Sequence, residues 1–380
     1  MATTAAEPIA APVASRALNL QIIRRYGHFL ELEPAWDSLL ESIGNQNPFL
    51  EFSWARSWWD SFGSGSELNI VVIWDGEQAV AIVPLMRTPI RMMGLSISRL
   101  GFFYNSHVPR TDFIVARGRP DAYRLIWQHL TSQRDWDLLQ LCQLETASQT
   151  MLEMLELAHA DGYPTGVWAS SESPYVGLDQ SWPEYSAGLA TKHRSNLRNR
   201  FKRLKAAGNV RLETASGEED IDTLLDAGYA LEAAAWKGEA GTAIASSGDL
   251  RNFYHAFAQS AARRGWLRLH FLCAEDRRIA FDYSLEYNGS VFLLKQGYDP
   301  EYSAYSPSNL LLSMELEEAA GRRGARFDFL GDFAEWKRCW AQESTSHSWL
   351  YIFARTPKAR LAHYLKFVLA PIAKRFKRIR

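Results

Sequence analysis

Apolar residues along this chain follow two kinds of spacing, and the same succession occurs in both halves. Apolar side chains every three or four positions predict amphipathic helices, whereas short apolar runs bounded by turn residues predict strands. In the first half the pattern predicts, in order, helices over 32–42 and 50–62, a hairpin of strands 68–74 and 79–85 around Asp75-Gly76, a strand over 111–116, a helix over 121–130 and a strand over 136–141.

The second half repeats this order about 200 residues later. It predicts a hairpin of strands 267–274 and 279–287, a strand over 291–296 after the turn Asn288-Gly289, a helix over 310–322 and a strand over 326–330. Two copies of one α/β unit therefore account for the pattern, although few residues are identical between the copies. Ser, Gly and Pro gather at 170–183, which places the boundary there.

The expected fold class is α/β, with mixed sheets in two consecutive units. We expect units at 18–175 and 176–355, a disordered leader at 1–17 and a basic amphipathic tail at 356–380. The leader lacks the charged start and apolar run of a secretory signal. The longest late apolar run, 367–373, is too short to span a bilayer. A cytoplasmic protein is the simplest expectation.

Composition excludes several classes of protein. With 47% hydrophobic and 22% charged residues, the 380-residue chain has a globular balance rather than a disordered or collagen-like one. Its three cysteines form no CxxC pair and its nine histidines lack metal-ligand spacing, so we expect neither a disulfide framework nor a metal. The P-loop, HExxH, GxSxG and GxGxxG signatures are absent from the sequence.

The net charge of −1 hides two strongly basic segments. Residues 192–205 carry seven Lys or Arg and residues 355–380 carry nine, with no acid in either segment. The first predicts a helix whose basic face suits phosphates, nucleic acid or an acidic polymer, or is only a solvated surface. The second predicts an amphipathic helix that packs on the protein or attaches to an anionic membrane surface.

The densest candidate site follows the strand at 291–296. The chain crosses a loop with three tyrosines and enters a helix for which Ser306 is a suitable N-cap and Pro307 a suitable first residue. Backbone N–H groups at a helix N-terminus bind anions, so this junction is a candidate phosphate site. An ordinary capped helix is the alternative interpretation.

Two further segments carry candidate side chains. Asp332 follows the strand at 326–330, at the edge where α/β sheets hold ligands, and is a candidate general base or acid, or else a turn former. Lys337 is placed to pair with Asp332 or to bind a phosphate, whereas Asp328 is expected to be structural. Trp236-Lys237 lies at an expected helix end, where the ring either stacks on a substrate or belongs to the core.

These segments resemble an acyltransferase family associated with cellulose-biosynthesis operons, which belongs to the GNAT (N-acetyltransferase) superfamily and is related to the Fem aminoacyl-transferases. The resemblance covers residues 20–355 and leaves out the basic tail. It is carried by motifs in a fixed order: WDSLLES, NPFL, WARSWWDSF and DGEQAVAIVPL in the first half, and KHRSNLRNRFKRL, WKGEAGTAI, FYHAF, IAFDYSLEYNG, LLKQGYD, YSPSNLLL and FDFLGDFAEWKRCWA in the second.

The resemblance implies two tandem GNAT-type folds and transfer of an acetyl or longer acyl group from acyl-CoA to an amine or hydroxyl. No covalent enzyme intermediate and no metal are implied, and exopolysaccharide or cell-envelope biosynthesis is the implied setting. In such folds two parallel strands splay apart to admit the pantetheine arm; here they are 291–296 and 326–330. The pyrophosphate would lie at 306–309, where this sequence departs from the usual glycine-rich loop.

Specific roles are implied by the same resemblance. Asp332 accepts the proton of the nucleophile, and Tyr298 or Tyr302 protonates the leaving thiolate or orients the acceptor. A backbone N–H near Gln296 or Gly297 polarises the thioester carbonyl. The expected acyl-CoA contacts are Lys295, Gln296, Gly297, Tyr305, Ser306, Ser308 and Asn309, and the expected substrate contacts are Trp236, Lys237, Asp282 and Lys337.

Two other functions stay open on the sequence alone. A Fem-like transferase that uses aminoacyl-tRNA would place residues 192–205 on RNA phosphates, although no sustained heptad predicts the coiled-coil arm of that family. A non-enzymatic polysaccharide-binding module would use Trp and Tyr as platforms. Nucleic acid is otherwise not expected as a partner, whereas the tail is expected to pack on the protein or to meet the inner face of the membrane.

Overall fold

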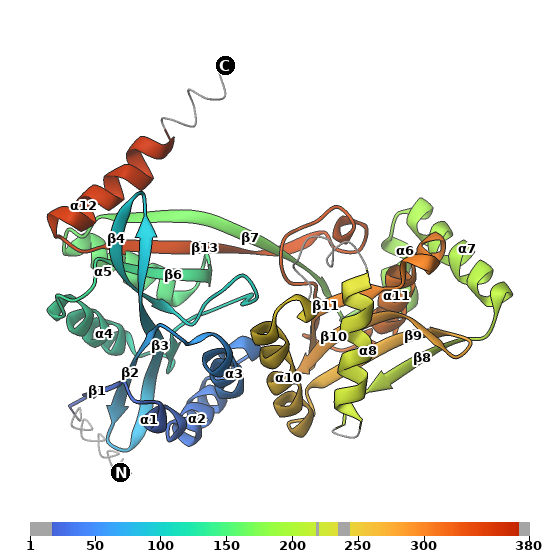
Figure 1. Ribbon diagram of the computed structural model, residues 1–380, viewed down its shortest axis with the longest axis horizontal. Helices are drawn as coiled ribbons and strands as arrows, with labels where there is room; N and C mark the ends of the chain where they lie inside the picture. Colours follow the sequence, from blue (N-terminus) through green and yellow to red (C-terminus); the bar gives the residue numbers. More distant parts are fainter. Residues whose placement is uncertain (1–16, 218–219, 235–243, 372–380) are drawn as a thin grey trace, which may run out of the picture.

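The computed structural model describes residues 17–217, 220–234 and 244–371. Its strands form one 13-stranded mixed sheet that runs through the molecule (Figure 1). The path across the sheet is β1 (Asn19–Ile23), β2 (Glu67–Asp75), β3 (Gln78–Met92), β4 (Leu95–Phe102), β6 (Leu138–Glu145), β13 (Glu343–Phe353), β7 (Thr165–Gly177), β12 (Arg326–Asp328), β11 (Ser290–Tyr298), β10 (Arg277–Tyr287), β9 (Leu267–Ala274) and β8 (Val210–Ala215), with β5 (Ile114–Val115) paired to β3 off this path.

The two ends of the sheet repeat one arrangement. β1 to β4 pair antiparallel and β4 then pairs with β6 in parallel. Likewise β8 to β11 pair antiparallel and β11 then pairs with β12 in parallel. The duplication that the sequence pattern predicts is therefore confirmed at the level of topology.

The last strands of the two halves have exchanged places at the centre of the sheet. β7 follows the first unit along the chain but pairs with β12 of the second. β13 follows the second unit but pairs with β6 of the first, and β7 and β13 also pair with each other. This exchange joins the halves by continuous backbone hydrogen bonding.

The structure differs from the sequence prediction at several elements. Part of the predicted boundary segment 170–183 is a strand, because β7 extends to Gly177, with buried Ser171 and Ser173 on either side of exposed Glu172. Small polar residues that alternate in this way form a strand, although their composition is typical of loops. The predicted strand at 111–116 is reduced to β5, and β13 has no counterpart in the sequence prediction.

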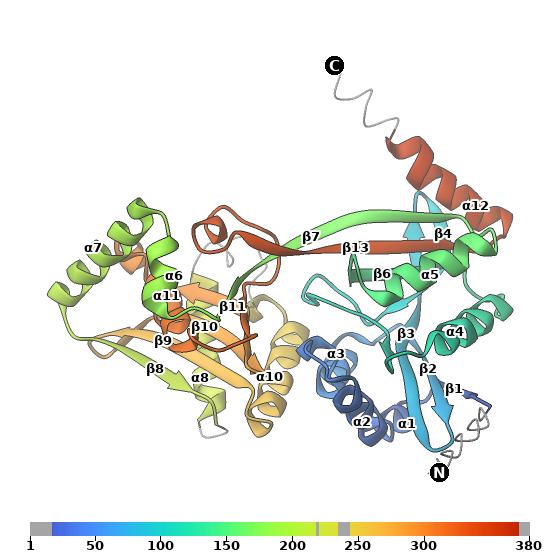
Figure 2. The same cartoon turned by 180° about the vertical axis from the view of Figure 1, so that it is seen from behind.

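Helices cover the sheet on both faces (Figure 2). They are α1 (Tyr26–Leu30), α2 (Glu33–Ile43), α3 (Phe52–Phe62), α4 (Pro120–Ser132), α5 (Gln149–Ala160), α6 (Trp182–Gly188), α7 (Thr191–Ala207), α8 (Ile221–Ala234), α10 (Gly248–Arg263), α11 (Pro307–Ala319) and α12 (Pro357–His363), the last continued by a π-helical stretch at Tyr364–Leu369. None of the helices in the described ranges is long and apolar enough to cross a membrane.

Side chains also join the two halves. Trp54 of α3 packs against Phe253 and Phe257 of α10, at ring-centroid distances of 4.9 and 4.8 Å. Arg110, which follows β4 in the first half, reaches Asp328 on β12, with 2.5 Å between Nη2 and Oδ2, and both side chains are almost fully buried. The expectation that Asp328 is structural agrees with this position.

Candidate active site

The parallel strands β11 and β12 separate almost as soon as they have paired. Only Val291 with Phe327 and Phe292 with Asp328 join them, after which β12 ends while β11 continues through 293–298. Among the backbone hydrogen bonds of the described residues, none joins this stretch to the chain that follows β12. The second half thus has the opening between parallel strands that the family resemblance implies.

A β-bulge lies where the opening begins. Tyr283 of β10 pairs with Lys295, whereas the next residue, Ser284, pairs with Leu293, so Leu294 is the extra residue of β11. A bulge bends its strand and changes the direction of the side chains beyond it. The bulge therefore sets which side chains of β11 point to each face of the sheet at the opening.

The N-terminus of α11 lies just beyond β11, and its cap differs from the prediction. Ser306 holds the N-cap position, but its backbone is left-handed (φ 49°, ψ 60°) and its hydroxyl makes no capping hydrogen bond. The amides of Asn309 and Leu310 both donate to the carbonyl of Ser306, and Pro307 has no N–H. Fewer amides are therefore available to an anion than the sequence suggests, and Ser308 supplies the earliest one.

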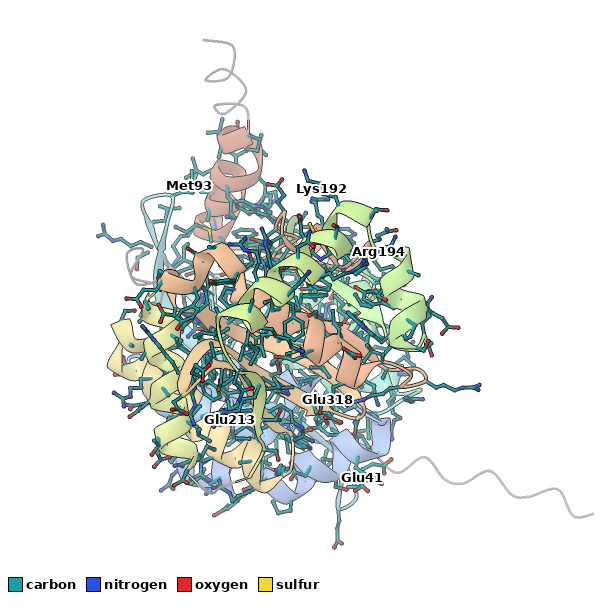
Figure 3. All side chains as sticks on the ribbon, turned by 90° about the vertical axis from the view of Figure 1, so that its right-hand side faces the viewer. Glu41, Met93, Lys192, Arg194, Glu213 and Glu318 are labelled. Carbon is teal, nitrogen blue, oxygen red and sulfur yellow. The ribbon has the colours of Figure 1, made fainter. Side chains whose placement is uncertain are left out.

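The basic helix α7 lies beside this helix end. The guanidinium of Arg203 stacks on the ring of Tyr305 at 5.4 Å, and the ring of His193 contacts that of Trp340 at 4.6 Å. Trp340 in turn donates its indole N–H to Asn309 at 3.1 Å. Figure 3 shows Lys192 and Arg194 of α7 on the outer surface. Among the described residues, no ion pair involves a Lys or Arg of α7.

The three tyrosines of the predicted site gather on the same side. Tyr298, Tyr302 and Tyr305 pack around the apolar cluster that contains Leu310 of α11 and partly buried Phe201 of α7. The rings of Tyr302 and Tyr305 are 6.3 Å apart. The three rings therefore pack on the side of the sheet that α7 and α11 cover.

A buried polar network lies under α11. Gln296 donates to Asp282 at 3.2 Å, and Glu315 of α11 lies 3.3 Å from His270 and 3.5 Å from the Ser284 hydroxyl. Burial raises the pKa of the Glu315 carboxyl well above its ordinary value, and Asp282 raises it further, while His270 opposes the shift. The protonated form of Glu315 is therefore favoured, and this network holds Gln296 in place.

Lys295 points to the opposite face of the sheet, towards α8 and α10. Its ammonium lies 3.2 Å from His107 Nδ1, 3.9 Å from the buried carboxylate of Glu232 and 5.0 Å from the ring centre of Tyr254. Next to it, a Cβ on Gly297 would lie 2.4 Å from the backbone nitrogen of Glu232, so α8 packs directly on this glycine. We call Lys295, His107, Glu232 and Tyr254 the lysine cluster.

Three members of the lysine cluster were missed by the sequence analysis. His107 belongs to the first half and is 188 positions from Lys295, so no local pattern connects them. Glu232 lies four positions before the motif WKGEAGTAI, yet no periodicity shows that its carboxylate is buried. Burial and the neighbouring Glu232 charge both raise the pKa of Tyr254, which keeps its phenol neutral.

Asp332 lies on an exposed turn beyond β12. Leu330 and Gly331 before it are both left-handed, with φ of 49° and 56°. The buried ammonium of Lys337 donates to the carbonyl groups of Leu330 and Asp332, the latter at 2.9 Å, and lies over the ring of Trp336. Lys337 thus fixes the backbone of this turn and leaves the carboxylate of Asp332 facing solvent.

Two expected substrate contacts, Trp236 and Lys237, lie outside the described residues. Among the residues that the structure describes, no group of three or more His, Cys, Asp or Glu side chains is placed to hold a metal ion. The remaining expected residues lie in three places: the α7–α11 side, the turn beyond β12 with Asp332 and Lys337, and the opposite face with Lys295 and Gly297.

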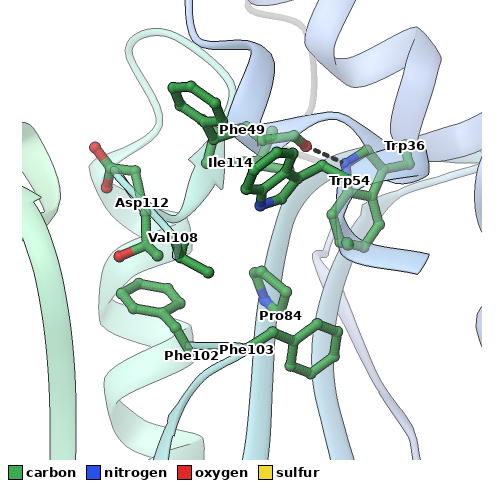
Figure 4. A pocket seen from close by; sticks show the side chains of 12 residues that line it. Trp36, Phe49, Trp54, Pro84, Phe102, Phe103, Val108, Asp112 and Ile114 are labelled. Carbon is green, nitrogen blue, oxygen red and sulfur yellow. Dashed lines mark hydrogen bonds between the residues drawn. The ribbon is translucent and has the colours of Figure 1, made fainter. Parts of the chain in front are cut away.

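The corresponding region of the first half is filled. Thr111 donates its backbone N–H to the carbonyl of Gln143 on β6 at 3.2 Å, so the chain after β4 occupies the edge of β6. The cavity nearby measures about 30 Å³ and is lined mainly by apolar side chains, with Asp112 at its border (Figure 4). Such a volume holds about two water molecules.

Comparison with known proteins now identifies the type of domain. A family model described as an acetyltransferase (GNAT) domain matches residues 191–338. That match covers α7, the opening, α11 and Asp332. No curated protein matches the chain at the significance applied.

Solved structures extend the likeness to the whole fold. A crystal structure of FemX superposes with a TM-score of 0.59 at 10% identity, covering 87% of this chain and 98% of that one. A conserved protein of unknown function from Bacteroides thetaiotaomicron gives 0.50 at 13% identity, covering 84% and 97%. A tandem GNAT protein from the clavulanic acid biosynthesis pathway gives 0.44 at 12% identity, covering 88% and 98%.

The chain therefore has a mixed α/β fold whose two halves share one strand topology, and residues 191–338 match a GNAT acetyltransferase family model. Identities near 10% establish the fold and not the substrate.

Proposed function

We propose that this protein is an acyl-CoA-dependent acyltransferase that moves an acetyl or longer acyl group to an amine or a hydroxyl. The observation that supports the proposal is the short ladder between β11 and β12, which has two residue pairs and ends with β12 while β11 continues to Tyr298. Backbone amides alternate in direction along a strand, so those of β11 that do not point to β10 face the opening. They are available to a pantetheine arm and to the thioester carbonyl.

The phosphates of the donor are assigned to the α11 side of the sheet. Ser308 lies in the first turn of α11, which contains no acid, and the helix dipole favours an anion there. The Lys and Arg side chains of α7 supply further positive charge beside Tyr305. Pyrophosphate would thus be held by a few amides and several guanidinium groups rather than by a glycine-rich loop.

The acceptor is assigned to the lysine cluster. A donor that enters from the α11 side and passes between the strands delivers its acyl end to the opposite face. There Lys295 and Glu232 form a charged pair inside the protein, which suits a polar acceptor. An acceptor in exopolysaccharide or cell-envelope biosynthesis fits the family resemblance.

The proposed reaction is direct attack of the acceptor nitrogen or oxygen on the thioester carbonyl. A β11 amide near Gln296 or Gly297 stabilises the oxyanion of the tetrahedral intermediate. Asp332, directly or through water, takes the proton of the acceptor. When the carbon–sulfur bond breaks, Tyr298 or Tyr302 protonates the CoA thiolate.

Calorimetric titration with acetyl-CoA and longer acyl-CoAs tests the donor assignment. We expect binding by the wild type and about tenfold weaker binding by Arg198→Glu, because the substitution reverses a charge on α7. Arg263→Glu, which reverses an exposed charge on α10, serves as the matched control. Failure of every acyl-CoA to bind would contradict the proposal, and mass spectrometry of candidate acceptors would identify the product.

A Fem-like transferase is a second candidate, because the basic face of α7 also suits RNA phosphates. An electrophoretic shift with tRNA that weakens steeply with salt, together with no acyl-CoA binding, would favour it. Binding of a glycan, together with no binding of acyl-CoA or tRNA, would favour the non-enzymatic polysaccharide-binding module.

A further inference from the structure

Large apolar side chains are concentrated on the surface at one end of the molecule. Ten are exposed among the described residues, and seven of these lie on three adjoining elements. They are Met93 at the tip of the β3–β4 hairpin, Val167 and Trp168 on β7, and Leu361, Tyr364, Val368 and Leu369 on α12 and its π-helical extension. We call these seven side chains the apolar end face. Figures 1 and 2 show α12 and the β3–β4 tip projecting at the same end.

The base of this face is firmly packed. The ring of Phe367 covers Gly166 of β7 so closely that a Cβ there would lie 2.3 Å from it. Phe367 also contacts Tyr351 of β13, with 5.3 Å between ring centres. Partly buried Ile90 and Met92 of the hairpin pack on the same apolar cluster. Because these inward-facing side chains of the hairpin, β7 and the C-terminal helix pack together, the outward-facing side chains of the same elements form one continuous surface.

The exposure of these side chains is not explained by the fold. Met93 is 49% exposed at a turn position with φ of 51°, where Asn or Gly is the favoured residue. Trp168 is 49% and Leu361 47% exposed. Single exposed apolar side chains are common, but a group on adjoining elements marks an interaction surface.

The charges around the face are positive. Arg91 and Arg360 are exposed and take part in no ion pair between described residues. Lys366 lies over the ring of Trp168 at 4.5 Å. Residues 355–371 contain no acid, and the printed sequence adds five Lys or Arg and no acid in 372–380. A second copy of this face would bring like charges together, whereas an anionic surface would complement them.

We propose that the apolar end face docks on the surface of an anionic lipid bilayer. Apolar and aromatic side chains with flanking cations are the combination that places a helix in the headgroup region without crossing the membrane. Met93 and Trp168 enter the boundary beside α12, and Arg91, Arg360 and Lys366 contact lipid phosphates. This docking goes beyond the proposed acyl transfer and does not depend on it.

Sedimentation of the full-length protein with lipid vesicles tests the proposal. The probes are vesicles of phosphatidylcholine alone and of phosphatidylcholine with 30% phosphatidylglycerol. The test variant is Trp168→Ser combined with Leu361→Ser, which keeps every basic residue. Its matched control is Tyr26→Ser combined with Leu152→Ser, which removes an exposed aromatic ring and an exposed leucine outside the face. Circular dichroism checks that both variants fold.

We expect the wild type to bind the anionic vesicles only, the test variant to lose about tenfold in vesicle affinity and the control to bind as the wild type does. Wild type that remains in the supernatant would overturn the proposal. Unchanged binding by the test variant would also overturn it, because the basic residues alone would then be sufficient. The same holds if light scattering shows a dimer that the test variant converts to a monomer, without vesicle binding.

Discussion

The two halves of the molecule share a topology but differ at the point where their parallel strands separate. In the first half, the chain after β4 hydrogen-bonds to the edge of β6 and leaves a cavity of about 30 Å³. In the second, β11 pairs with β12 at two positions only and continues through 293–298 after β12 has ended. We call the first the closed half and the second the open half.

The N-termini of the corresponding helices, α4 and α11, also differ between the closed and the open half. α4 of the closed half begins with Pro120 and Asp121, and the Asp121 carboxylate accepts hydrogen bonds from Arg119 at 3.0 Å. α11 of the open half begins with Pro307 and Ser308 and has no acid in its first turn. An aspartate there occupies the positive end of the helix dipole with the protein's own charge, whereas serine leaves it to a ligand. The closed half thus has a structural role, whereas the open half keeps the features of a binding site.

The largest expected effect concerns the contact between the halves. Arg110→Ala leaves Asp328 buried, and although Arg326 also lies 3.5 Å from it, we expect a loss of about 3 kcal/mol in the free energy of unfolding. Urea denaturation measures this loss, and we expect one transition because the halves share the sheet. The control, Arg251→Ala, breaks an exposed ion pair with Asp226 and should cost less than about 1 kcal/mol.

Two separate transitions in the wild type would contradict this prediction, since the closed half would then not support the open one. The double variant Arg110→Met with Asp328→Leu should recover much of the lost stability, because it removes both buried charges together.

Asp332→Ala should abolish most turnover and leave the fold intact. Asp332 lies on the turn that follows β12 in the open half. Loss of a general base lowers the rate about 100-fold or more. We expect kcat to fall while acyl-CoA affinity, measured by calorimetry, stays unchanged. Glu335→Ala removes an exposed carboxylate three positions away and should have no effect. Normal turnover by Asp332→Ala would remove this residue from the mechanism.

Ser308→Asp gives the open half the residue of the closed half. We expect acyl-CoA affinity to fall about 30-fold, because the new carboxylate competes with the donor phosphates at the helix end. Thermal stability should hold or rise slightly, since an acid suits the first turn of a helix. The reciprocal variant, Asp121→Ser, should leave acyl-CoA binding unchanged. Loss of binding by both variants, or by neither, would break the distinction between the halves.

Much of the fold was predictable from local patterns. Strand β9 has the predicted bounds of 267–274, and α7 extends the predicted basic helix at 192–205 by a few residues. These elements follow from side-chain periodicity within one segment. The exchange of β7 and β13 was not predictable, because pairing between distant strands leaves no mark on the periodicity of either one.

Some features of the candidate site were likewise predictable from the sequence, and others were not. The N-terminus of α11 was predicted from the order of strand, loop and helix, whereas the opening between the strands was predicted only from the family resemblance. The left-handed backbone of Ser306 was not, since serine has no special preference for that conformation. The direction of Lys295 towards His107 depends on the bulge at Leu294 and on a residue of the other half, so only the folded chain shows it.

The smallest expected effect concerns Asp112, the acid at the border of the first-half cavity. Burial raises the pKa of Asp112 to about 7, although hydrogen bonds from Thr150 and the Phe113 amide oppose the shift. The folded state therefore holds a proton that the unfolded state releases near pH 4. Between these values stability falls as pH rises, and above about pH 7 the loss is complete.

Asp112→Asn keeps an acceptor for the Phe113 amide and removes the charge. We expect this variant to exceed the wild type in unfolding free energy by about 1–2 kcal/mol at pH 8 and by much less at pH 5. Urea denaturation at both pH values measures the difference, and subtraction of the two proteins cancels other titrating groups such as Glu315. An equal difference at both pH values would mean that Asp112 is ionised in the folded protein. The first-half cavity would then be a hydrated, charged site, and the distinction between a closed and an open half would fail at this residue.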